Sequence, residues 1–179
     1  MIAPFDENIL FVDTEFTSLD PYLGELLSVA LIRPDGEEFY VEIEHEGFVS
    51  SFVRERVLPY LAGPKVPREE AQARIRAFVG AARPRLLANV DSYDTIYLYK
   101  LFGMDDERRD HHPFRWQPLD LPSMLFAHGL DPEAMAKDPL GFARGLGIEM
   151  GEHRQHHALD DARLLRRVYL RLASGAELQ

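Results

Sequence analysis

Short apolar runs separated by turn residues occupy the first quarter of the chain. Residues 9–12 are apolar and end at Asp13, residues 26–32 form a second apolar run, and residues 38–44 alternate between apolar and polar positions. Between the last two runs lies Arg33-Pro34-Asp35-Gly36, a sequence typical of a tight turn. The pattern predicts three strands, with a hairpin between the second and the third.

The rest of the chain predicts helices, loops and one further strand. Helix starts are marked by a capping serine, an initial proline or acids in the first turn, and helix ends by glycine or proline. On these signals we expect a fourth strand over residues 85–90, a short extended piece near Trp116, and helices over residues 51–58, 67–79, 94–102, 122–128, 139–146 and 158–172. Loops are expected over residues 62–67 and 105–112. Strands that come first and then intermix with helices indicate an α/β fold with a mixed sheet, and we expect a single domain over residues 1–179.

Composition narrows the classes of protein that fit. Hydrophobic residues make up 46% of the chain, as in globular proteins, and no apolar run approaches the roughly 18 residues of a membrane span. The absence of cysteine excludes disulfides, thiol catalysis and thiolate zinc sites, and fits a reducing, cytoplasmic location. A formal net charge of -10 argues against bulk attraction to nucleic acid. It leaves room for an enzyme whose acidic site is filled by divalent cations, because bound ions reverse the local field.

Acids follow two of the predicted strands directly. Asp13 and Glu15 are two residues apart, so in an extended chain both point to one face at the strand end. Burying two carboxylates without a cation is costly, although a strand that frays into a polar turn would also place them there. Asp94 stands where the fourth strand meets the next helix, a position that a helix N-cap also explains. Asp91 competes with it as the functional acid of this segment.

Two histidines and two aspartates open the last predicted helix, in the segment His156-His157-Ala158-Leu159-Asp160-Asp161. Acids in the first turn of a helix are stabilised by its dipole, which explains them when they are taken alone. Together with the two earlier segments, however, they make a third place where an acid lies at the end of an apolar element. A cluster of carboxylate oxygens suits Mg²⁺ or Mn²⁺ and not Zn²⁺.

In order and spacing the three segments resemble the motifs of the DEDDh 3′–5′ exonucleases, which include proofreading exonucleases, RNase T and oligoribonuclease. The first motif corresponds to Val12-Asp13-Thr14-Glu15, the second to Asp94, and the third to the segment from His156 to Asp161. The resemblance implies an RNase H-like fold and an exonuclease that releases nucleoside 5′-monophosphates from 3′-hydroxyl ends. All four acids of the motifs are present.

The resemblance also assigns a role to each matched residue. Two divalent cations, Mg²⁺ or Mn²⁺, would support in-line phosphodiester hydrolysis, and His156 would be the general base. The metal-binding acids, which count as catalytic with His156, would be Asp13, Glu15, Asp94 and Asp161.

Substrate contacts are implied directly after the first motif, where relatives touch the terminal bases. The candidates in this chain are Phe16, Thr17 and Leu19. Stacking of bases on such side chains tolerates any sequence, because every base has a π-face. Core packing is the alternative reading for Phe16 and Leu19.

Three stretches narrow the resemblance to RNase AS, the small mycobacterial exoribonuclease that acts on polyadenylate. They are Asp13-Thr14-Glu15-Phe16, residues 52–59 (FVRERVLP) and residues 89–94 (NVDSYD). This likeness implies an RNA substrate, a preference for adenylate-rich RNA, and a homodimer. Two alternatives stay open: a DNA 3′–5′ exonuclease of the proofreading kind, and a non-catalytic nucleic-acid-binding module on the same fold.

Helix geometry conflicts with the motif at first sight. At about 100° per residue His157 shares a face with Asp161, whereas His156 and Asp161 are about 140° apart. The conflict disappears if His156 lies in the loop before the helix and Asp161 already lies in its first turn. On that reading His157 and Asp160 are bystanders, with Asp160 assisting the helix start.

The remaining histidines have no motif around them. His111 and His112 stand in a charge-rich stretch and are expected to be solvated. His153 is close to the third motif and is expected to lie on the surface.

Overall fold

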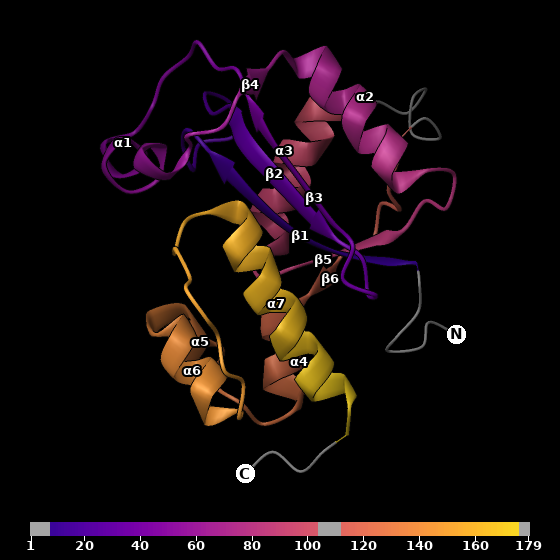
Figure 1. The fold of residues 1–179 in the computed structure, drawn as a ribbon, viewed down its shortest axis with the longest axis vertical. Helices are drawn as coiled ribbons and strands as arrows, with labels where there is room; N and C mark the ends of the chain where they lie inside the picture. Colours follow the sequence, from indigo (N-terminus) through magenta and orange to yellow (C-terminus); the bar gives the residue numbers. More distant parts are fainter. Residues whose placement is uncertain (1–7, 104–111, 176–179) are drawn as a thin grey trace.

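A computed structural model describes residues 8–103 and 112–175 of the chain (Figure 1). Its centre is a six-stranded sheet with the strand order β4-β3-β2-β1-β5-β6. The β1–β2 and β2–β3 pairs are antiparallel and the β3–β4, β1–β5 and β5–β6 pairs are parallel, so the mixed sheet predicted from the sequence is confirmed. The strands are β1 (Ile9–Phe16), β2 (Leu26–Ile32), β3 (Glu38–Ile43), β4 (Lys65–Val66), β5 (Arg85–Ala88) and β6 (Leu119–Asp120).

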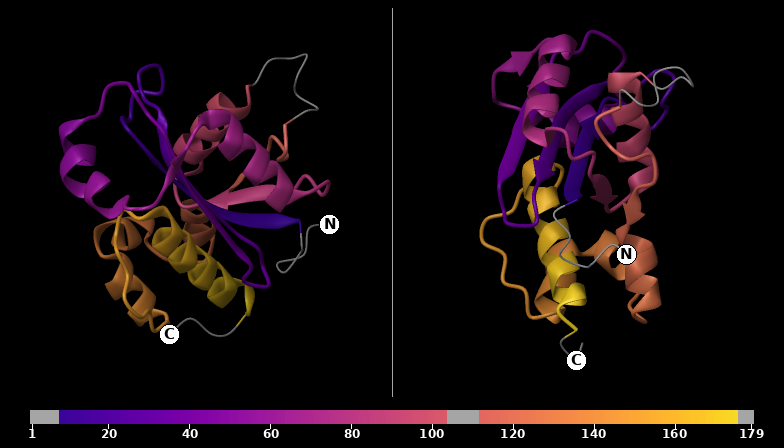
Figure 2. Two further views of the ribbon diagram at one scale, coloured as in Figure 1. Left: turned by 45° about the horizontal axis from the view of Figure 1, so that its top comes forward. Right: turned by 90° about the vertical axis from the view of Figure 1, so that its right-hand side faces the viewer.

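Helices cover both faces of this sheet. In the left view of Figure 2 the sheet separates α2 and α3 from α7, and α4 to α6 lie on the α7 side. The helices are α1 (Ser51–Arg56), α2 (Arg68–Val79), α3 (Asp91–Phe102), α4 (Leu121–Ala127), α5 (Pro132–Lys137), α6 (Pro139–Gly145) and α7 (Ala158–Ala173), with the 3-10 turn η1 (Leu58–Tyr60) after α1. No helix within the described ranges is long and apolar enough to cross a membrane.

The central strand β1 is buried on both faces, which explains its unbroken apolar run. Phe11 packs toward α7, whereas Val12 packs toward α2 and α3. Because side chains alternate across a strand, Asp13 and Glu15 continue the row of Phe11. The end of β1 therefore directs both acids to the α7 side of the sheet.

Three elements differ from the sequence prediction. Helix α3 begins at Asp91, so Asp94 lies inside its first turn and is not the N-cap. Helix α5 was not predicted, although Asp131 before it is a cap whose side chain accepts a hydrogen bond from the Glu133 N–H. Strand β4 lies in a predicted loop, because two residues become a strand only through pairing with β3.

His112 is buried, contrary to the prediction that it is solvated, and His111 lies outside the described residues. The His112 ring packs edge-on against the rings of Tyr99, Phe102 and Phe114. Burial lowers its pKa to about 4, because the cationic ring would be desolvated there. The charged sequence around it gave no sign of the aromatic environment that the fold supplies.

Acid should destabilise the protein through this ring. An unfolded histidine titrates near pH 6.5, so between about pH 6.5 and pH 4 the unfolded chain binds a proton that the folded chain does not. The free energy of unfolding should therefore fall by about 1–2 kcal/mol between pH 7 and pH 5. Urea titrations of wild type and His112→Leu measure this difference, and the variant should lose the pH dependence. The same change at the exposed His128 is the control, and equal slopes in all three proteins would contradict the assignment.

Candidate metal-binding active site

Parallel pairing brings the second acid-bearing segment to the end of β1. Strands β1 and β5 run in the same direction, with Phe11 opposite Leu87, so the chain leaves β5 beside Asp13 and turns into α3. The first turn of α3 then places Asp94 against β1, where the Thr14 hydroxyl donates a hydrogen bond of 2.7 Å to Asp94 Oδ1. Asp94 is 5% exposed. Asp94 is therefore not a helix N-cap but a buried carboxylate that is hydrogen-bonded to β1.

The third segment approaches from the opposite side, along α7. His156 precedes the helix in the left-handed backbone region, with a φ of 65°, and Asp161 lies in the first turn. The His156 N–H donates to Asp161 Oδ2 at 2.8 Å. One ligand atom each from Glu15, His156 and Asp161 lie within 4.8 Å of one another, a spacing that could hold a metal ion. The loop-then-helix arrangement inferred from the motif is thus the one that the structure has.

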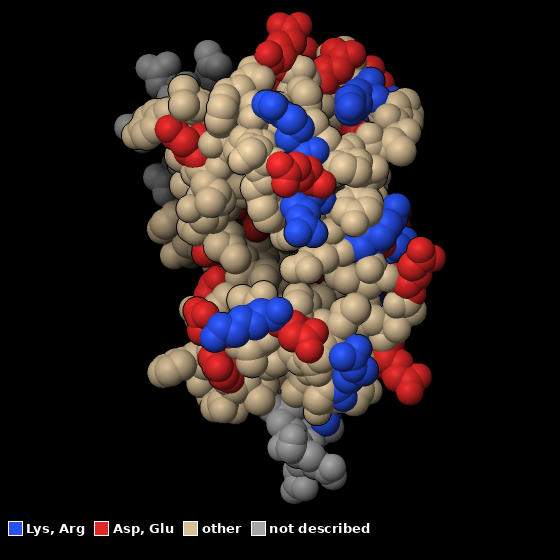
Figure 3. Space-filling view, turned by 90° about the vertical axis from the view of Figure 1, so that its left-hand side faces the viewer, with Lys and Arg blue, Asp and Glu red and all other residues tan. Residues whose placement is uncertain are grey.

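A single pocket of about 370 Å³ joins these segments. Its lining also includes Val90 and Tyr93, and Met135 and Pro139. Figure 3 shows that the surface is hollowed on this side of the molecule, with acidic atoms inside the hollow and Lys and Arg side chains on its margins. All five residues that the motifs matched line this pocket: Asp13, Glu15, Asp94, His156 and Asp161.

Burial, and in second place the negative charge of neighbouring acids, disfavours the ionised form of the pocket carboxylates. Burial, and then the charges of Asp94, Asp161 and Glu15, raise the pKa of Asp13 well above its usual range. Burial and the neighbouring acids raise the pKa of Glu15 to about 8, and burial raises that of Asp94 to about 7. Divalent cations would relieve this repulsion, and oxygen donors of this kind suit Mg²⁺ or Mn²⁺. The donor set therefore fits the metal chemistry expected from the sequence.

The metal-free protein should lose stability as the pH rises, and Mg²⁺ should restore it. An unfolded glutamate titrates near pH 4.3, whereas folded Glu15 titrates near 8. Between these values the unfolded chain has released a proton that the folded chain keeps, so the free energy of unfolding falls with rising pH. Thermal melts in EDTA at about pH 5 and about pH 8, repeated with Mg²⁺, measure the effect. Stabilisation by Mg²⁺ should be larger at the higher pH.

Charge-neutral variants separate this effect from general pH sensitivity. Glu15→Gln should flatten the slope in EDTA, because it removes one of the mutually repelling groups. Glu133→Gln changes an exposed glutamate on α5 and should keep the wild-type slope. A Glu15→Gln slope equal to that of wild type would show that Glu15 does not cause the pH dependence.

The predicted substrate residues lie in different surroundings. Phe16 lines the pocket and stacks on Tyr97, with ring centroids 4.4 Å apart, so this partly buried ring both packs on the core and lines the pocket. Leu19 also lines the pocket and is 64% exposed. Thr17 is buried away from the pocket, and its hydroxyl accepts a hydrogen bond from the Glu25 N–H. Phe16 and Leu19 remain candidates for base contacts, whereas Thr17 holds the turn after β1.

The structure also shows where Asp91, His157 and Asp160 lie relative to the pocket. Asp91 does not line the pocket, so the structure brings Asp94 and not Asp91 to the other carboxylates. The His157 ring points to the sheet and stacks on Tyr40, with centroids 5.1 Å apart. Asp160 is 5% exposed and forms an ion pair with Arg154. It therefore does more than assist the helix start, which was the role expected for it.

His153 lies beside the acidic cluster and not on the surface as predicted. Its side chain is 2% exposed, and its Nε2 lies 3.1 Å from Asp161 Oδ1. The nearby Asp161 carboxylate raises the pKa of the ring. No periodicity or motif marked this histidine, because its position depends on how the loop before α7 folds back.

Comparison with known proteins gives a fold and no family. No family model and no curated protein sequence matches the chain. Among solved structures, the zinc-bound complex of E. coli exonuclease I with single-stranded DNA is 17% identical, with a TM-score of 0.64 over 93% of this chain and 40% of that chain. The E. coli exonuclease I complex with a dT13 oligonucleotide has a TM-score of 0.63 at 17% identity, over 93% and 41% of the two chains. A product-bound exonuclease I has a TM-score of 0.61 at 15% identity, over 93% and 43%.

These likenesses establish the fold. This chain spans about 40% of the length of the exonuclease I chains that it matches. At such low identity the match shows that the mixed sheet and its helices are arranged as in exonuclease I, which confirms the fold class expected from the sequence.

Proposed function

We propose that this protein is a metal-dependent 3′–5′ exonuclease that acts on RNA and releases nucleoside 5′-monophosphates. The observation that carries the proposal is the convergence of four carboxylates and His156 on one pocket, from three segments far apart in the sequence. A buried cluster of this kind is unfavourable without cations, which argues for a functional reason to keep it. The fold of exonuclease I agrees with this reading.

The proposed reaction is hydrolysis of the terminal phosphodiester. Water attacks phosphorus, the bond to the 3′ oxygen of the preceding nucleotide breaks, and that oxygen takes a proton from solvent. Two divalent cations, when bound, stabilise the charge on the attacking and leaving oxygens. His156, placed beside Glu15 and Asp161, accepts the proton of the attacking water. The acids that hold the cations are Asp13, Glu15, Asp94 and Asp161.

Two substrate classes are supported by different observations. RNA, and adenylate-rich RNA in particular, is supported by the sequence resemblance to RNase AS. DNA is supported by the exonuclease I complexes, which contain single-stranded DNA or a dT13 oligonucleotide. We propose RNA as the substrate and keep a DNA 3′–5′ exonuclease as the second candidate.

A degradation panel tests the proposal directly. Single-stranded RNA and DNA of equal length, labelled at the 5′ end and carrying a 3′ hydroxyl, are incubated with Mg²⁺ or Mn²⁺ and with EDTA. We expect stepwise shortening of RNA that EDTA abolishes, with adenylate homopolymers degraded fastest. Faster shortening of DNA would favour the second candidate. Binding without turnover under every metal condition would favour a non-catalytic module and overturn the proposal.

The assembly and location are further proposals. The resemblance to RNase T and RNase AS supports a homodimer, and the absence of cysteine supports the cytoplasm. Light scattering on the purified protein measures the mass in solution. A mass of 20.5 kDa, that of one chain, would contradict the dimer.

A further inference from the structure

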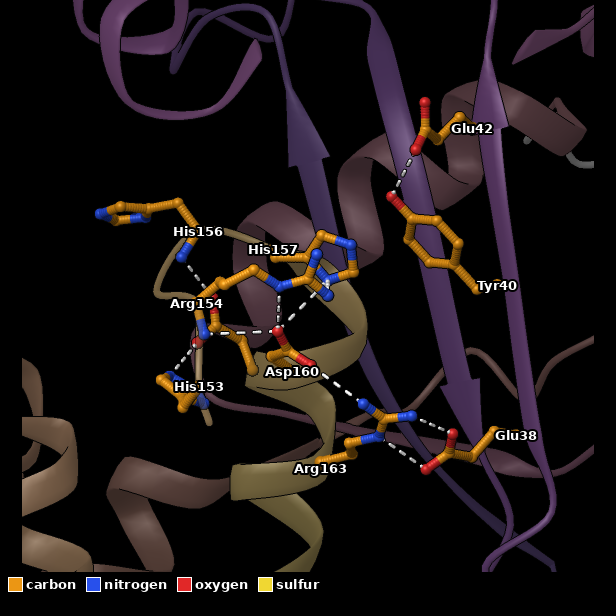
Figure 4. Close-up of polar contacts among 10 residues, drawn as sticks. Glu38, Tyr40, Glu42, His153, Arg154, His156, His157, Asp160 and Arg163 are labelled. Atoms are coloured by element: carbon orange, nitrogen blue, oxygen red, sulfur yellow. Dashed lines mark hydrogen bonds and ion pairs between the residues drawn. The ribbon is translucent and has the colours of Figure 1, made fainter. Parts of the chain in front are cut away.

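Asp160 ties the loop before α7 to the helix itself. Its carboxylate is buried, and its Oδ2 accepts hydrogen bonds from Arg154 Nε at 2.7 Å and from the Arg154 backbone N–H at 3.3 Å (Figure 4). The same aspartate therefore holds both the side chain and the backbone of Arg154. Hydrogen bonds to a charged group are among the stronger ones, and the Asp160 carboxylate is buried although the Arg154 side chain is 44% exposed.

The other oxygen of Asp160 anchors it to the sheet. Asp160 Oδ1 accepts from Arg163 Nη1 at 3.0 Å, one helical turn further along α7. Arg163 in turn forms a two-pronged pair with Glu38 at the start of β3, with distances of 2.8 and 2.6 Å. The planar guanidinium matches two carboxylates in a fixed geometry. The Asp160 carboxylate is thus fixed independently of the loop that it holds.

The loop held in this way carries His156 in a strained backbone conformation. A φ of 65° is unusual for histidine, and residues in this backbone region persist only where their surroundings enforce them. Two contacts enforce it here. Asp160 holds the loop at Arg154, and Asp161 holds it at the His156 N–H, 2.8 Å away.

Asp160 and Asp161 therefore hold the same loop at two different residues, Arg154 and His156. We propose that Asp160 is a positioning residue, which keeps the imidazole of His156 at the acidic cluster by clamping Arg154. This inference rests on the proposed function, in which His156 is the general base. Without the clamp the loop can relax toward a lower-energy backbone, which moves the ring away from Glu15 and Asp161. The edge contact of His156 with Phe52 would not prevent this, because Phe52 is 54% exposed on α1.

A purely structural role makes a different prediction. Asp160 lies in the first turn of α7, where a carboxylate also stabilises the helix through its dipole. If that were its whole role, its loss would lower the melting temperature and leave the turnover of the folded enzyme unchanged. The kinetic parameters of folded variants therefore separate the two roles.

The test compares substitutions of Asp160 with substitutions of Arg154 and Arg163, which bind the two oxygens of its carboxylate. Asp160→Ala and Arg154→Ala should each lower kcat by about 10- to 100-fold and change KM by less than about 3-fold. The double variant should be no slower than Asp160→Ala, because that change already removes both hydrogen bonds between Arg154 and residue 160. Asp160→Asn keeps an acceptor for Arg154 and should recover most of the lost kcat. Arg163→Gln removes the anchor of Asp160 on the sheet but leaves both Asp160–Arg154 hydrogen bonds in place, so it should lower kcat by less than Asp160→Ala does.

Amide hydrogen exchange over residues 153–158 provides a readout that does not need activity. Asp160→Ala should speed exchange at the Arg154 and His156 amides, whereas Arg163→Gln should speed it less, because both hydrogen bonds from Arg154 to Asp160 remain. If wild type cleaves no oligonucleotide, the proposed function fails and this exchange pattern still decides the clamp. A kcat of Asp160→Ala equal to that of Arg163→Gln, or an unchanged His156 amide, would overturn the positioning role.

Discussion

An Asp13→Asn protein should fold, bind little Mg²⁺ and hydrolyse a 3′-hydroxyl oligonucleotide at least about 1,000-fold more slowly than wild type. Asp13 lies between the other acids of the pocket, and the charges of all three act on it. Removing its charge takes away a proposed metal ligand and leaves the shape of the site nearly unchanged. The rate constant for loss of the terminal nucleotide, measured with saturating Mg²⁺, tests this expectation.

The same substitution should stabilise the protein in EDTA. Asp13 is buried among like charges, so an uncharged amide of equal size removes repulsion that no cation offsets under these conditions. In EDTA at about pH 8 we expect Asp13→Asn to melt at a higher temperature than wild type. With Mg²⁺ present this difference should become small, because the cations stabilise wild type. A variant that is both inactive and less stable in EDTA would indicate misfolding and not the loss of a metal ligand. A variant that keeps wild-type activity would contradict the two-metal proposal.

Replacing His156 by alanine should lower kcat by about 100- to 10,000-fold, which is the usual contribution of a general base. The side chain belongs to the same three-residue cluster as Glu15 and Asp161, and it lines the pocket. Its loss should leave Mg²⁺-induced stabilisation largely intact, because the acids remain. Single-turnover rates and thermal melts with and without Mg²⁺ separate these two effects.

His157→Ala is the matched control, one residue further along the same loop. The His157 ring packs on Tyr40 and does not line the pocket, so its loss should lower stability more than turnover. We expect kcat within about 10-fold of wild type for the folded fraction. If His157→Ala were the slower enzyme, the assignment of the general base to His156 would be wrong.

Stability and function oppose each other in this site. The buried carboxylates of Asp13, Glu15 and Asp94 and the positive φ of His156 raise the free energy of the folded, metal-free chain, and packing of the surrounding core offsets that cost. The clamp at Asp160 is part of that support. Variants that neutralise one of the buried acids are therefore expected to be more stable without metal and less active, a pattern common at functional sites.

The strands and the site acids were predictable because they leave local signals. Residues 9–12 read as a buried strand since both faces of β1 are covered, and the alternation rule then placed Asp13 and Glu15 on one side. The break between His156 and the helix followed from the motif spacing and matches the observed start of α7. Short elements such as β4 could not be predicted from the sequence, because they become strands only by pairing with a strand from elsewhere in the chain.

By itself the sequence determined the mixed α/β fold, the set of acids and the position of His156 relative to the last helix, because periodicity and motif spacing are properties of the chain alone. Only the tertiary structure decided what surrounds each side chain. It buried His153 beside Asp161 and His112 among aromatic rings, turned Thr17 away from the pocket, and made Asp160 the partner of Arg154 and Arg163. Burial and charge pairing depend on residues brought together from distant segments, and no local pattern encodes them.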